Sequence, residues 1–288
     1  MTGEEKKSKF TLILSMVIFG TIGIFRRYIP LPSSMLAMTR GLTGVLFLIA
    51  LMVVKRNKFS WKAIQNNWIL LLVSGALLGF NWILLFEAYQ YTSIATATLC
   101  YYMAPIIVIL VSPIALKEKV TGKKLICVGI ALVGMIFISG VLKTGFTGLD
   151  ELKGVFLGLG AAALYAGIII LNKKMKDIPG NDKTVVQLGT SAVVLMPYVL
   201  LTENVSDIIF TPLILCMILV VGILHTGIAY ALYFGSMKAL KAQTIALFSY
   251  IDPIVAIILS ALLLHEAMGV MEITGAVLVL GATMEGEI

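Results

Sequence analysis

Charged residues are scarce in this sequence of 288 residues, where Asp, Glu, Lys and Arg together make up only 13% of the chain. Hydrophobic residues make up 59%, and the mean hydropathy is +1.01. A typical soluble domain carries about 25% charged residues, so this composition excludes the soluble globular class. The sequence therefore predicts an integral membrane protein.

Histidine and cysteine are also rare. The three cysteines all fall inside apolar runs, which excludes a disulfide framework: Cys100, Cys127 and Cys216. His265 and Glu266 could begin a zinc-protease motif, but Gly269 stands where its second histidine is needed. Neither a Gly-x-Ser-x-Gly elbow nor a Walker-type phosphate loop occurs. We therefore expect no enzyme, no metal and no cofactor, so a transport activity would have to run on gradients.

The chain is basic, with a formal net charge of +7 and an isoelectric point near 9.2. A nucleic-acid binder would combine a basic groove with stacking aromatics, and the sequence lacks that combination. Its positive charges cluster in loops between apolar runs, which indicates membrane topology. We expect a lipid bilayer, and no nucleic acid, as partner. Because the first apolar run continues for a full span, we expect no cleavable signal peptide.

Ten apolar runs are each expected to cross a hydrocarbon core of about 30 Å. They cover approximately residues 10–25, 34–54, 68–89, 94–116, 125–142, 154–171, 184–201, 211–237, 242–264 and 271–284. Glu272 intrudes into the last of them. The predicted fold class is all-α, a polytopic membrane protein of ten transmembrane helices.

One stretch of the chain occurs twice, from Phe86 to Glu118 and from Phe234 to Glu266. A single ungapped shift of 148 residues superimposes Phe86 on Phe234, Tyr102 on Tyr250, Pro105 on Pro253, Ile106 on Ile254, Ile109 on Ile257, Ser112 on Ser260, Leu116 on Leu264 and Glu118 on Glu266. A match at this long period indicates two related halves. We expect a first five-helix repeat over residues 1–142, an inter-repeat loop over 143–153 and a second five-helix repeat over 154–288.

Basic residues concentrate in alternate loops, and the opposite loops are acidic or nearly neutral. The basic set is Lys6, Lys7, Lys9, Lys55, Arg56, Lys58, Lys62, Lys117, Lys119, Lys123, Lys124, Lys173, Lys174, Lys176, Lys183, Lys238 and Lys241. Only Arg26 and Arg27 depart from this pattern. The positive-inside rule then predicts cytoplasmic N- and C-termini in the cell (inner or plasma) membrane. Each expected repeat has five helices. Because this number is odd, the second repeat begins on the opposite side of the membrane from the first, so the repeats are expected to be inverted.

This organisation resembles the drug/metabolite transporter superfamily, specifically its EamA-type branch. In each half the fourth helix carries a mid-span proline and ends thirteen residues later in a glutamate, Glu118 or Glu266. Phe19-Gly20 facing Tyr165-Ala166 in the repeat alignment, and Arg40 early in the second helix, also fit. The resemblance covers nearly the whole chain. It implies a substrate path between the halves and transport of amino acids, nucleotide sugars or other small metabolites, with a direction that varies among members.

Pro105 and Pro253 each remove a backbone N–H in mid-membrane and displace the carbonyl four residues earlier, that of Tyr101 or of Ser249. Such groups persist in a bilayer only where protein or water satisfies them, so these helices are expected to border a polar cavity. The alternative is that both prolines only kink their helices for packing. Candidate substrate-binding residues, whose aromatics can instead pack in the core, are Asn81, Trp82, Tyr101, Tyr102, Tyr230, Ser249 and Tyr250.

Four ionisable residues inside the expected spans are candidates for charge or coupling roles. Asp252 can carry a proton, can neutralise a cationic substrate, or can be a capped structural aspartate. His225 either relays that proton or is satisfied structurally. Arg40 and Glu87 either form a structural ion pair or bind the carboxylate and the amine of a substrate. The candidate gating or interfacial residues are Pro105, Glu118, Pro253 and Glu266.

These observations favour a secondary active transporter that exports small metabolites, with amino acids or related compounds first, by alternating access at a central pocket. The alternative is a transporter of organic cations or drugs that uses an intramembrane carboxylate. A channel or sensory membrane protein is a third possibility, which conductive flux would favour. The expected partners are a small-molecule substrate, the lipid bilayer and protons as coupling ion, and the expected state is a monomer or weak homodimer.

Overall fold

The computed structural model describes residues 3–26, 28–92, 94–139, 142, 149–204, 211–263 and 269–285. Every regular element in these ranges is a helix, which confirms the predicted all-α class. The helices form two compact units, unit 1 (Met1–Ile83 with Leu171–Leu240) and unit 2 (Leu84–Ile170 with Lys241–Ile288). Each unit combines segments from both halves of the chain, so the division into residues 1–142 and 154–288 stays a prediction about the sequence repeat.

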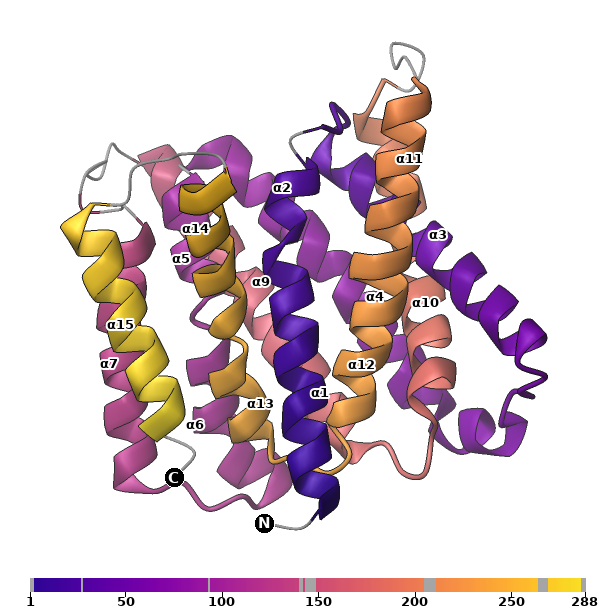
Figure 1. Ribbon diagram of the computed structural model, residues 1–288, viewed down its shortest axis with the longest axis horizontal. Helices are drawn as coiled ribbons and strands as arrows, with labels where there is room; N and C mark the ends of the chain where they lie inside the picture. Colours follow the sequence, from indigo (N-terminus) through magenta and orange to yellow (C-terminus); the bar gives the residue numbers. More distant parts are fainter. Residues whose placement is uncertain are drawn as a thin grey trace. The chain divides into compact units, whose positions relative to one another are not determined.

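Unit 1 contains seven elements that lie wholly within it among the described residues: α1 (Gly3–Gly20), α2 (Ile22–Arg26), α3 (Ser33–Val54), α10 (Gly180–Thr202), α11 (Pro212–Val220), η2 (Val221–Ile228) and α12 (Ala229–Ser236) (Figure 1). It also holds α4 (Trp61–Tyr91) up to Ile83 and the end of α9 (Leu149–Lys174). α3 packs against α10 and η2, and α1 packs against α12. Buried aliphatic side chains, among them Leu31 and Val221, form an apolar core within unit 1.

Glycines allow the helices of unit 1 to approach closely. A Cβ on Gly75 would lie 2.7 Å from the Cβ of Thr190, and a Cβ on Gly79 would lie 2.9 Å from that of Val194. Atoms at these distances overlap, so a side chain at either position would clash with α10. The close packing of α4 on α10 therefore depends on both glycines.

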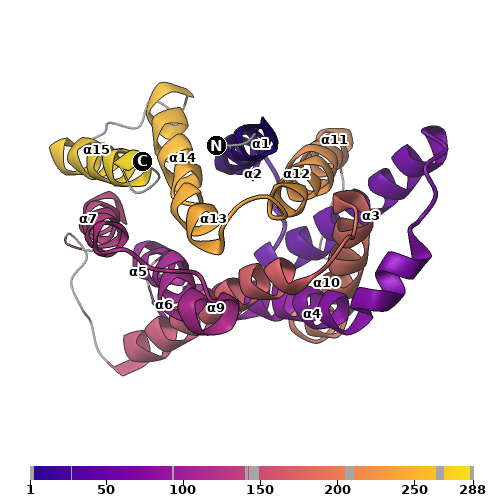
Figure 2. The ribbon, with the colours of Figure 1, turned by 90° about the horizontal axis from the view of Figure 1, so that it is seen from below.

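Unit 2 contains six helices that lie wholly within it among the described residues: α5 (Ile94–Tyr101), α6 (Ala104–Leu116), α7 (Gly122–Ser139), α13 (Ala242–Phe248), α14 (Ile251–Leu263) and α15 (Val270–Glu285). It also holds most of α9 and the end of α4. α7 and α15 lie side by side and bury Met135 and Val279 between them (Figure 2). A Cβ on Gly275 would lie 2.5 Å from the carbonyl oxygen of Gly134, so this helix pair is also in backbone contact.

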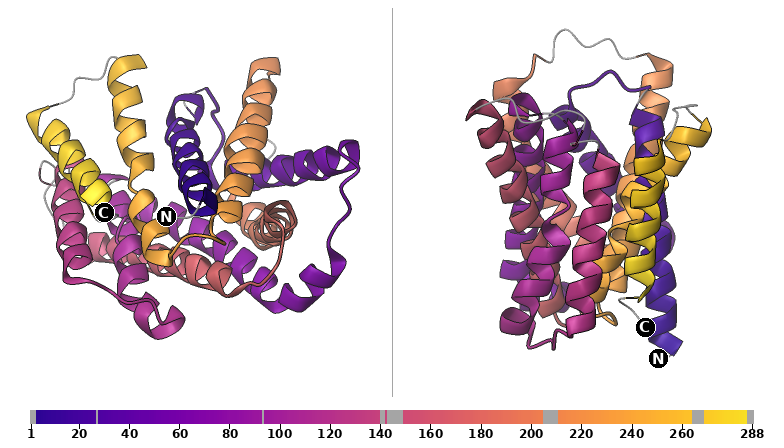
Figure 3. Two further views of the ribbon diagram at one scale, coloured as in Figure 1. Left: turned by 60° about the horizontal axis from the view of Figure 1, so that its bottom comes forward. Right: turned by 90° about the vertical axis from the view of Figure 1, so that its left-hand side faces the viewer.

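Two membrane helices of unit 2 are broken in the middle. α5 ends at Tyr101 before α6 begins at Ala104, and α13 ends at Phe248 before α14 begins at Ile251 (Figure 3). The shift of 148 residues that defines the repeat brings the two breaks within one residue of each other. The breaks therefore occupy matching places in the two halves.

The prolines explain these breaks. Pro105 and Pro253 each stand in the first turn after a break, and both are buried. A proline ring provides no N–H for the preceding turn and clashes with the carbonyl four residues earlier. The chain crosses the first break with a bond from the N–H of Met103 to the carbonyl of Cys100, 3.1 Å long. The ring and the missing N–H of proline thus account for the position of both interruptions.

Eight helices of the described part are long and apolar enough to cross a membrane. They cover Gly3–Arg26, Ser33–Val54, Trp61–Tyr91, Thr96–Leu116, Glu151–Lys174, Gly180–Thr202, Pro212–Ser236 and Ala242–Leu263. Large aliphatic side chains on them are exposed, such as Ile114 (88%) and Leu201 (86%), as a hydrocarbon environment favours. α7 and α15, the expected fifth and tenth spans, are not among the eight. The count of ten spans, their inverted topology and the cytoplasmic termini therefore stay predictions.

Candidate functional site

An aromatic cluster surrounds Tyr230 in unit 1. Its ring centroid lies 5.0 Å from that of Phe19 on α1, 5.4 Å from that of Phe234 and 6.2 Å from that of Trp82 on α4. The Phe19 and Trp82 rings meet Tyr230 edge to face, which is the orientation that aromatic quadrupoles favour. Three helices that are distant in the sequence therefore converge on one tyrosine.

Arg40 of α3 extends this cluster with a positive charge. Its guanidinium carbon lies 4.8 Å from the ring centroid of Trp82, a cation–π contact. Trp82 is 5% exposed and the neighbouring Asn81 is fully buried. Arg40 itself is half-buried, and a cation–π contact stabilises by about 0.5–2 kcal/mol depending on how much water reaches it, so the contact favours this position of the guanidinium. A fixed guanidinium is a suitable partner for a planar carboxylate.

His225 lies in the middle of η2, a π-helical segment between α11 and α12. Its Nε2 atom is 2.7 Å from the hydroxyl of Thr21, the residue between α1 and α2. The Thr21 hydroxyl also lies 2.7 Å from the carbonyl oxygen of Ile18, and which partner donates in the Thr21–His225 pair depends on the histidine tautomer. The ring also packs against Phe25, 4.9 Å between centroids. A buried histidine that is hydrogen-bonded to a hydroxyl fits the structural alternative, although π-helical segments are frequent at functional sites.

Tyrosines gather at the breaks of unit 2. Tyr101 and Tyr102 lie 6.0 Å apart, and Tyr165 of α9 lies 5.6 Å from Tyr101, both between ring centroids. The hydroxyl of Tyr250, which is fully buried, donates to the carbonyl of Tyr102 at 3.2 Å. The Ser249 hydroxyl donates to the carbonyl of Ile245 at 2.9 Å. The hydroxyls of Tyr250 and Ser249 therefore satisfy backbone carbonyls at or near the two breaks.

Asp252 lies in the first turn of α14, next to Pro253. A carboxylate at this place interacts favourably with the helix dipole. Within the part of the chain that the structure describes, its carboxyl group has no hydrogen-bond or ion-pair partner. Glu87 is half-buried on α4 and belongs to unit 2. Among the described residues, no group of three or more His, Cys, Asp or Glu is placed to hold a metal ion.

Glu118 caps α13, a helix that begins more than a hundred residues later in the chain. Its carboxylate accepts hydrogen bonds from the N–H groups of Ala242, at 2.8 Å, and Gln243, at 3.4 Å, at the start of α13. The Gln243 side chain in turn donates to the hydroxyl of Ser112 on α6 at 3.0 Å. These bonds join α6 to α13, so an anchoring contact is present at one of the predicted interfacial residues. Its repeat equivalent, Glu266, lies outside the described residues.

The structure thus groups the predicted residues into two sets. Arg40, Asn81, Trp82, His225 and Tyr230 belong to unit 1. The set in unit 2 comprises Glu87, Tyr101, Tyr102, Pro105, Glu118, Ser249, Tyr250, Asp252 and Pro253.

Sequence reasoning did not select Phe19, Thr21, Tyr165 and Gln243 as site residues. The sequence offers a reason to select Phe19 and Tyr165, because the repeat alignment pairs them. In the structure each of them packs on an aromatic residue that was predicted for the site. No feature of the sequence points to Thr21 or Gln243, since the residues that they contact are 204 and 131 residues away in the chain. Such partners can be identified only from the folded chain.

Comparison with known proteins supports a transport role. The EamA-like transporter family matches the chain twice, over residues 6–140 and 152–284. The uncharacterized transporter YxxF of Bacillus subtilis (strain 168) is 31% identical over 282 residues, which cover 94% of this chain and 88% of that protein. Protein PecM of Dickeya dadantii (strain 3937) is 25% identical over 215 residues, covering 74% of this chain and 71% of that protein.

Protein RarD of Salmonella typhi is 23% identical over 277 residues, which cover 92% of this chain and 90% of that protein. A protein of known crystal structure superimposes with a TM-score of 0.86 over 97% of each chain, at 15% identity, so the fold is shared. Two family matches that together span most of the sequence, and a 31% identical transporter, lead to one conclusion. The chain belongs to the EamA-like transporter family of the drug/metabolite transporter superfamily.

Proposed function

We propose that this transporter is a secondary active exporter of small metabolites, with amino acids or related compounds as the first candidates. In this proposal ten helices form two inverted five-helix repeats with cytoplasmic termini, and alternating access takes place at a central pocket between the repeats. The matched breaks before Pro105 and Pro253 support a polar path, because interrupted backbone in a membrane needs protein or water around it.

The observation that carries the substrate class is the contact between Arg40 and Trp82, 4.8 Å from guanidinium carbon to ring centroid. A permanent positive charge inside a membrane span is costly and is a functional candidate by default. Held over an indole ring, Arg40 can receive a substrate carboxylate in the two-bond geometry that guanidinium groups favour. Glu87 is the proposed partner for the substrate amine. A zwitterion offers both charges.

Transport by purified protein in liposomes tests this assignment. We expect saturable counterflow with trans-stimulation for amino acids, which a conductive channel would not produce. Arg40→Ala should lower zwitterion transport at least about tenfold, the effect of losing one charge-assisted pair. Arg40→Lys should retain part of it, because Lys keeps the charge but loses the bidentate fork. Equal zwitterion transport by the wild-type and Arg40→Ala proteins would refute the amino-acid proposal.

Asp252 favours a second candidate, transport of organic cations or drugs. Its carboxyl group, within the described part of the chain, has no hydrogen-bond or ion-pair partner and stands at the break before Pro253. In this alternative a cationic substrate supplies the missing partner. Asp252→Asn should then abolish cation transport while Arg40→Ala leaves it intact. Cation transport that survives Asp252→Asn would exclude this candidate.

Proton coupling is a separate part of the proposal. Asp252 is the proposed proton carrier and His225 the proposed relay. Flux should therefore respond to an imposed pH gradient at zero membrane potential, and Asp252→Asn should remove that response. Flux that is independent of the gradient would contradict proton coupling but not the substrate class. A thermal-shift screen against amino acids, amines and sugars would identify which substrates to use.

A further inference from the structure

A small polar cavity lies in unit 1 where the α9–α10 connection meets the end of α12. Its volume is about 40 Å³. Since a cavity needs roughly 10–15 Å³ of this kind to hold one water, it accommodates about three groups of that size. It is lined by Asn172, Lys173, Met175, Asp177, Ile178, Lys183, Met237 and Lys238. Three of these residues are lysines and one is an aspartate.

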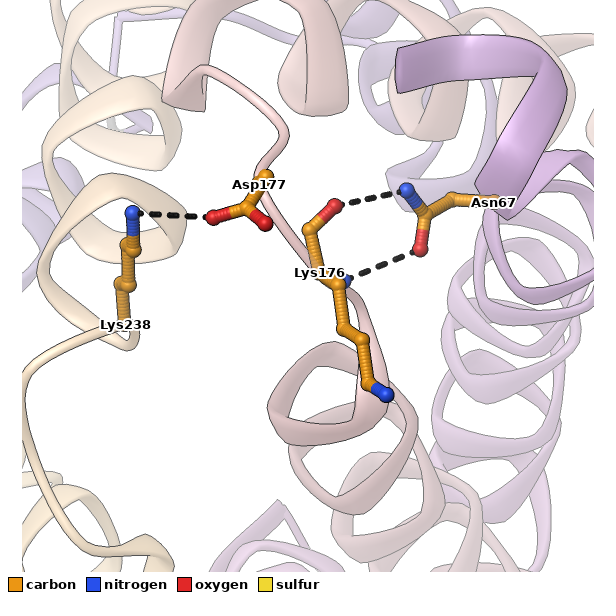
Figure 4. A network of polar contacts seen from close by, with 4 residues as sticks. All are labelled: Asn67, Lys176, Asp177 and Lys238. Atoms are coloured by element: carbon orange, nitrogen blue, oxygen red, sulfur yellow. Dashed lines mark hydrogen bonds and ion pairs between the residues drawn. The ribbon is translucent and has the colours of Figure 1, made fainter.

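The walls of the cavity are fixed by hydrogen bonds. Asn67 of α4 donates to the carbonyl of Lys176 at 2.9 Å and accepts from its N–H at 3.0 Å, while Lys238 pairs with Asp177 at 3.4 Å (Figure 4). Lys173 donates to the carbonyl of Met237 at 3.0 Å, at the C-terminal end of α12. The α9–α10 connection is therefore held from both sides, and two of the lysines around the cavity, Lys173 and Lys238, are held by these contacts.

Lys183 is the unusual member of this group. It lies in the first turn of α10 and is only 4% exposed. Among the described residues, its ammonium group meets neither a hydrogen-bond acceptor nor a carboxylate. The nearby ammonium groups of Lys173 and Lys238 repel it. The positive end of the α10 dipole adds to the repulsion, so positive charge predominates around the cavity.

Asp177 does not supply the missing charge. Its side chain is 90% exposed at the rim and is already paired with Lys238. Three ammonium groups against one carboxylate leave two positive charges around the cavity. Lys183 borders the cavity and is otherwise buried, so its ammonium group is poorly hydrated, and a bound anion would supply the partner that it lacks among the described residues.

We propose that this cavity binds a phosphate group, with Lys183 as its buried partner and Lys173 and Lys238 beside it. The cavity is large enough for the free oxygens of one phosphate and too small for a sugar or an amino acid. It lies between the apolar spans that end at Lys174 and begin at Gly180, which is the level of lipid headgroups in the expected membrane orientation. The phosphate therefore comes either from an anionic phospholipid or from solution.

Binding by delipidated full-length protein in neutral detergent tests the proposal. One arm titrates inorganic phosphate against chloride at equal ionic strength, read by thermal shift. The other adds dioleoylphosphatidylglycerol or the zwitterionic dioleoylphosphatidylcholine, read as adducts by native mass spectrometry. Stabilisation by phosphate alone identifies a soluble anion, and preferential adducts with phosphatidylglycerol identify a lipid headgroup. Either result supports a phosphate site, and the absence of both overturns it.

Lys183→Met and Lys174→Met form a matched pair, because Lys174 is exposed and does not line the cavity. The first should weaken binding about tenfold or more, and the second should leave it within about twofold. If Lys183→Met does not fold, Lys238→Met takes its place. It removes one cation and leaves Asp177 unpaired, so it should weaken binding about fivefold or more. Wild-type affinity in the folded variant would overturn the proposal.

Discussion

The hydroxyl of Tyr250 donates a hydrogen bond to the backbone carbonyl of Tyr102, 3.2 Å away. These are the two tyrosines that the shift of 148 residues superimposes, so equivalent positions of the two sequence halves are in direct contact. Each lies in the break of its own helix. The contact therefore satisfies one interrupted helix with a side chain from the other.

Tyr250→Phe removes this bond and leaves a buried carbonyl with one partner fewer. We expect the free energy of unfolding to fall by about 0.5–1.5 kcal/mol, measured by titration with a denaturing detergent. Tyr28→Phe is the matched control, because Tyr28 is 53% exposed and should tolerate the same change. Equal stability of the two variants would mean that the bond contributes nothing.

Thr21→Val removes the hydroxyl that bonds Nε2 of His225 and leaves that buried ring nitrogen without a partner. The expected cost is about 1–3 kcal/mol of unfolding free energy. Thr21→Ser keeps the hydroxyl and should therefore retain most of the unfolding free energy that Thr21→Val loses. Thr11→Val serves as control, since the Thr11 hydroxyl bonds the carbonyl of Lys7 on the exposed face of α1. A loss in Thr11→Val as large as that in Thr21→Val would argue against a specific histidine contact.

Glu118→Ala removes the cap of α13. We expect a loss of about 0.5–2 kcal/mol and faster hydrogen exchange at Ala242 and Gln243, whose N–H groups lose their acceptor. Glu285→Ala is the control in the same unit. It breaks only an ion pair with Lys123 between side chains that are 64% and 50% exposed. That pair should contribute less than about 1 kcal/mol. Unchanged exchange at α13 in Glu118→Ala would refute the capping role.

Gly275→Ala and Gly281→Ala, both on α15, should change stability in opposite directions. A Cβ on Gly275 would lie 2.5 Å from the carbonyl oxygen of Gly134, so overpacking should cost about 1–3 kcal/mol. No atom lies within 4 Å of a Cβ on Gly281, and alanine there should stabilise the helix by about 0.5–1 kcal/mol.

Gly134 and Gly129, both on α7, provide a second pair of variants for the same test. Gly134→Ala would place its Cβ 2.7 Å from the carbonyl oxygen of Gly275, while a Cβ on Gly129 has open space. Thermal unfolding of the four variants in detergent measures the difference. If both members of a pair shift the melting temperature in the same direction, the close contact between α7 and α15 does not exist as described.

The membrane class and the helix positions were accessible from the sequence because hydropathy and proline geometry are local properties. The run expected at residues 34–54 is α3 (Ser33–Val54), and the one expected at 242–264 contains α13 and α14. The hydropathy of the run at residues 242–264 does not reveal the break between α13 and α14. Hydropathy does not change where α13 ends at Phe248, and only Pro253 indicated an interruption.

The candidate site was less accessible. The aromatic and charged residues were chosen because such residues are rare or repeated inside apolar spans. That criterion selects Arg40 and Trp82 separately but does not predict the contact between them. It also missed Thr21, because a threonine in a membrane helix commonly bonds its own backbone, as Thr21 does with Ile18.

The sequence by itself determined the membrane class and the equivalent places of Pro105 and Pro253 under the shift of 148 residues, because hydropathy and an internal match depend only on the residues and their order. Only the tertiary structure decided which side chains meet. Thr21 and His225 are 204 residues apart, and Glu118 caps a helix that begins 124 residues later. Hydrogen bonds act over about 3 Å, so such partners become visible only when the folded helices bring them together.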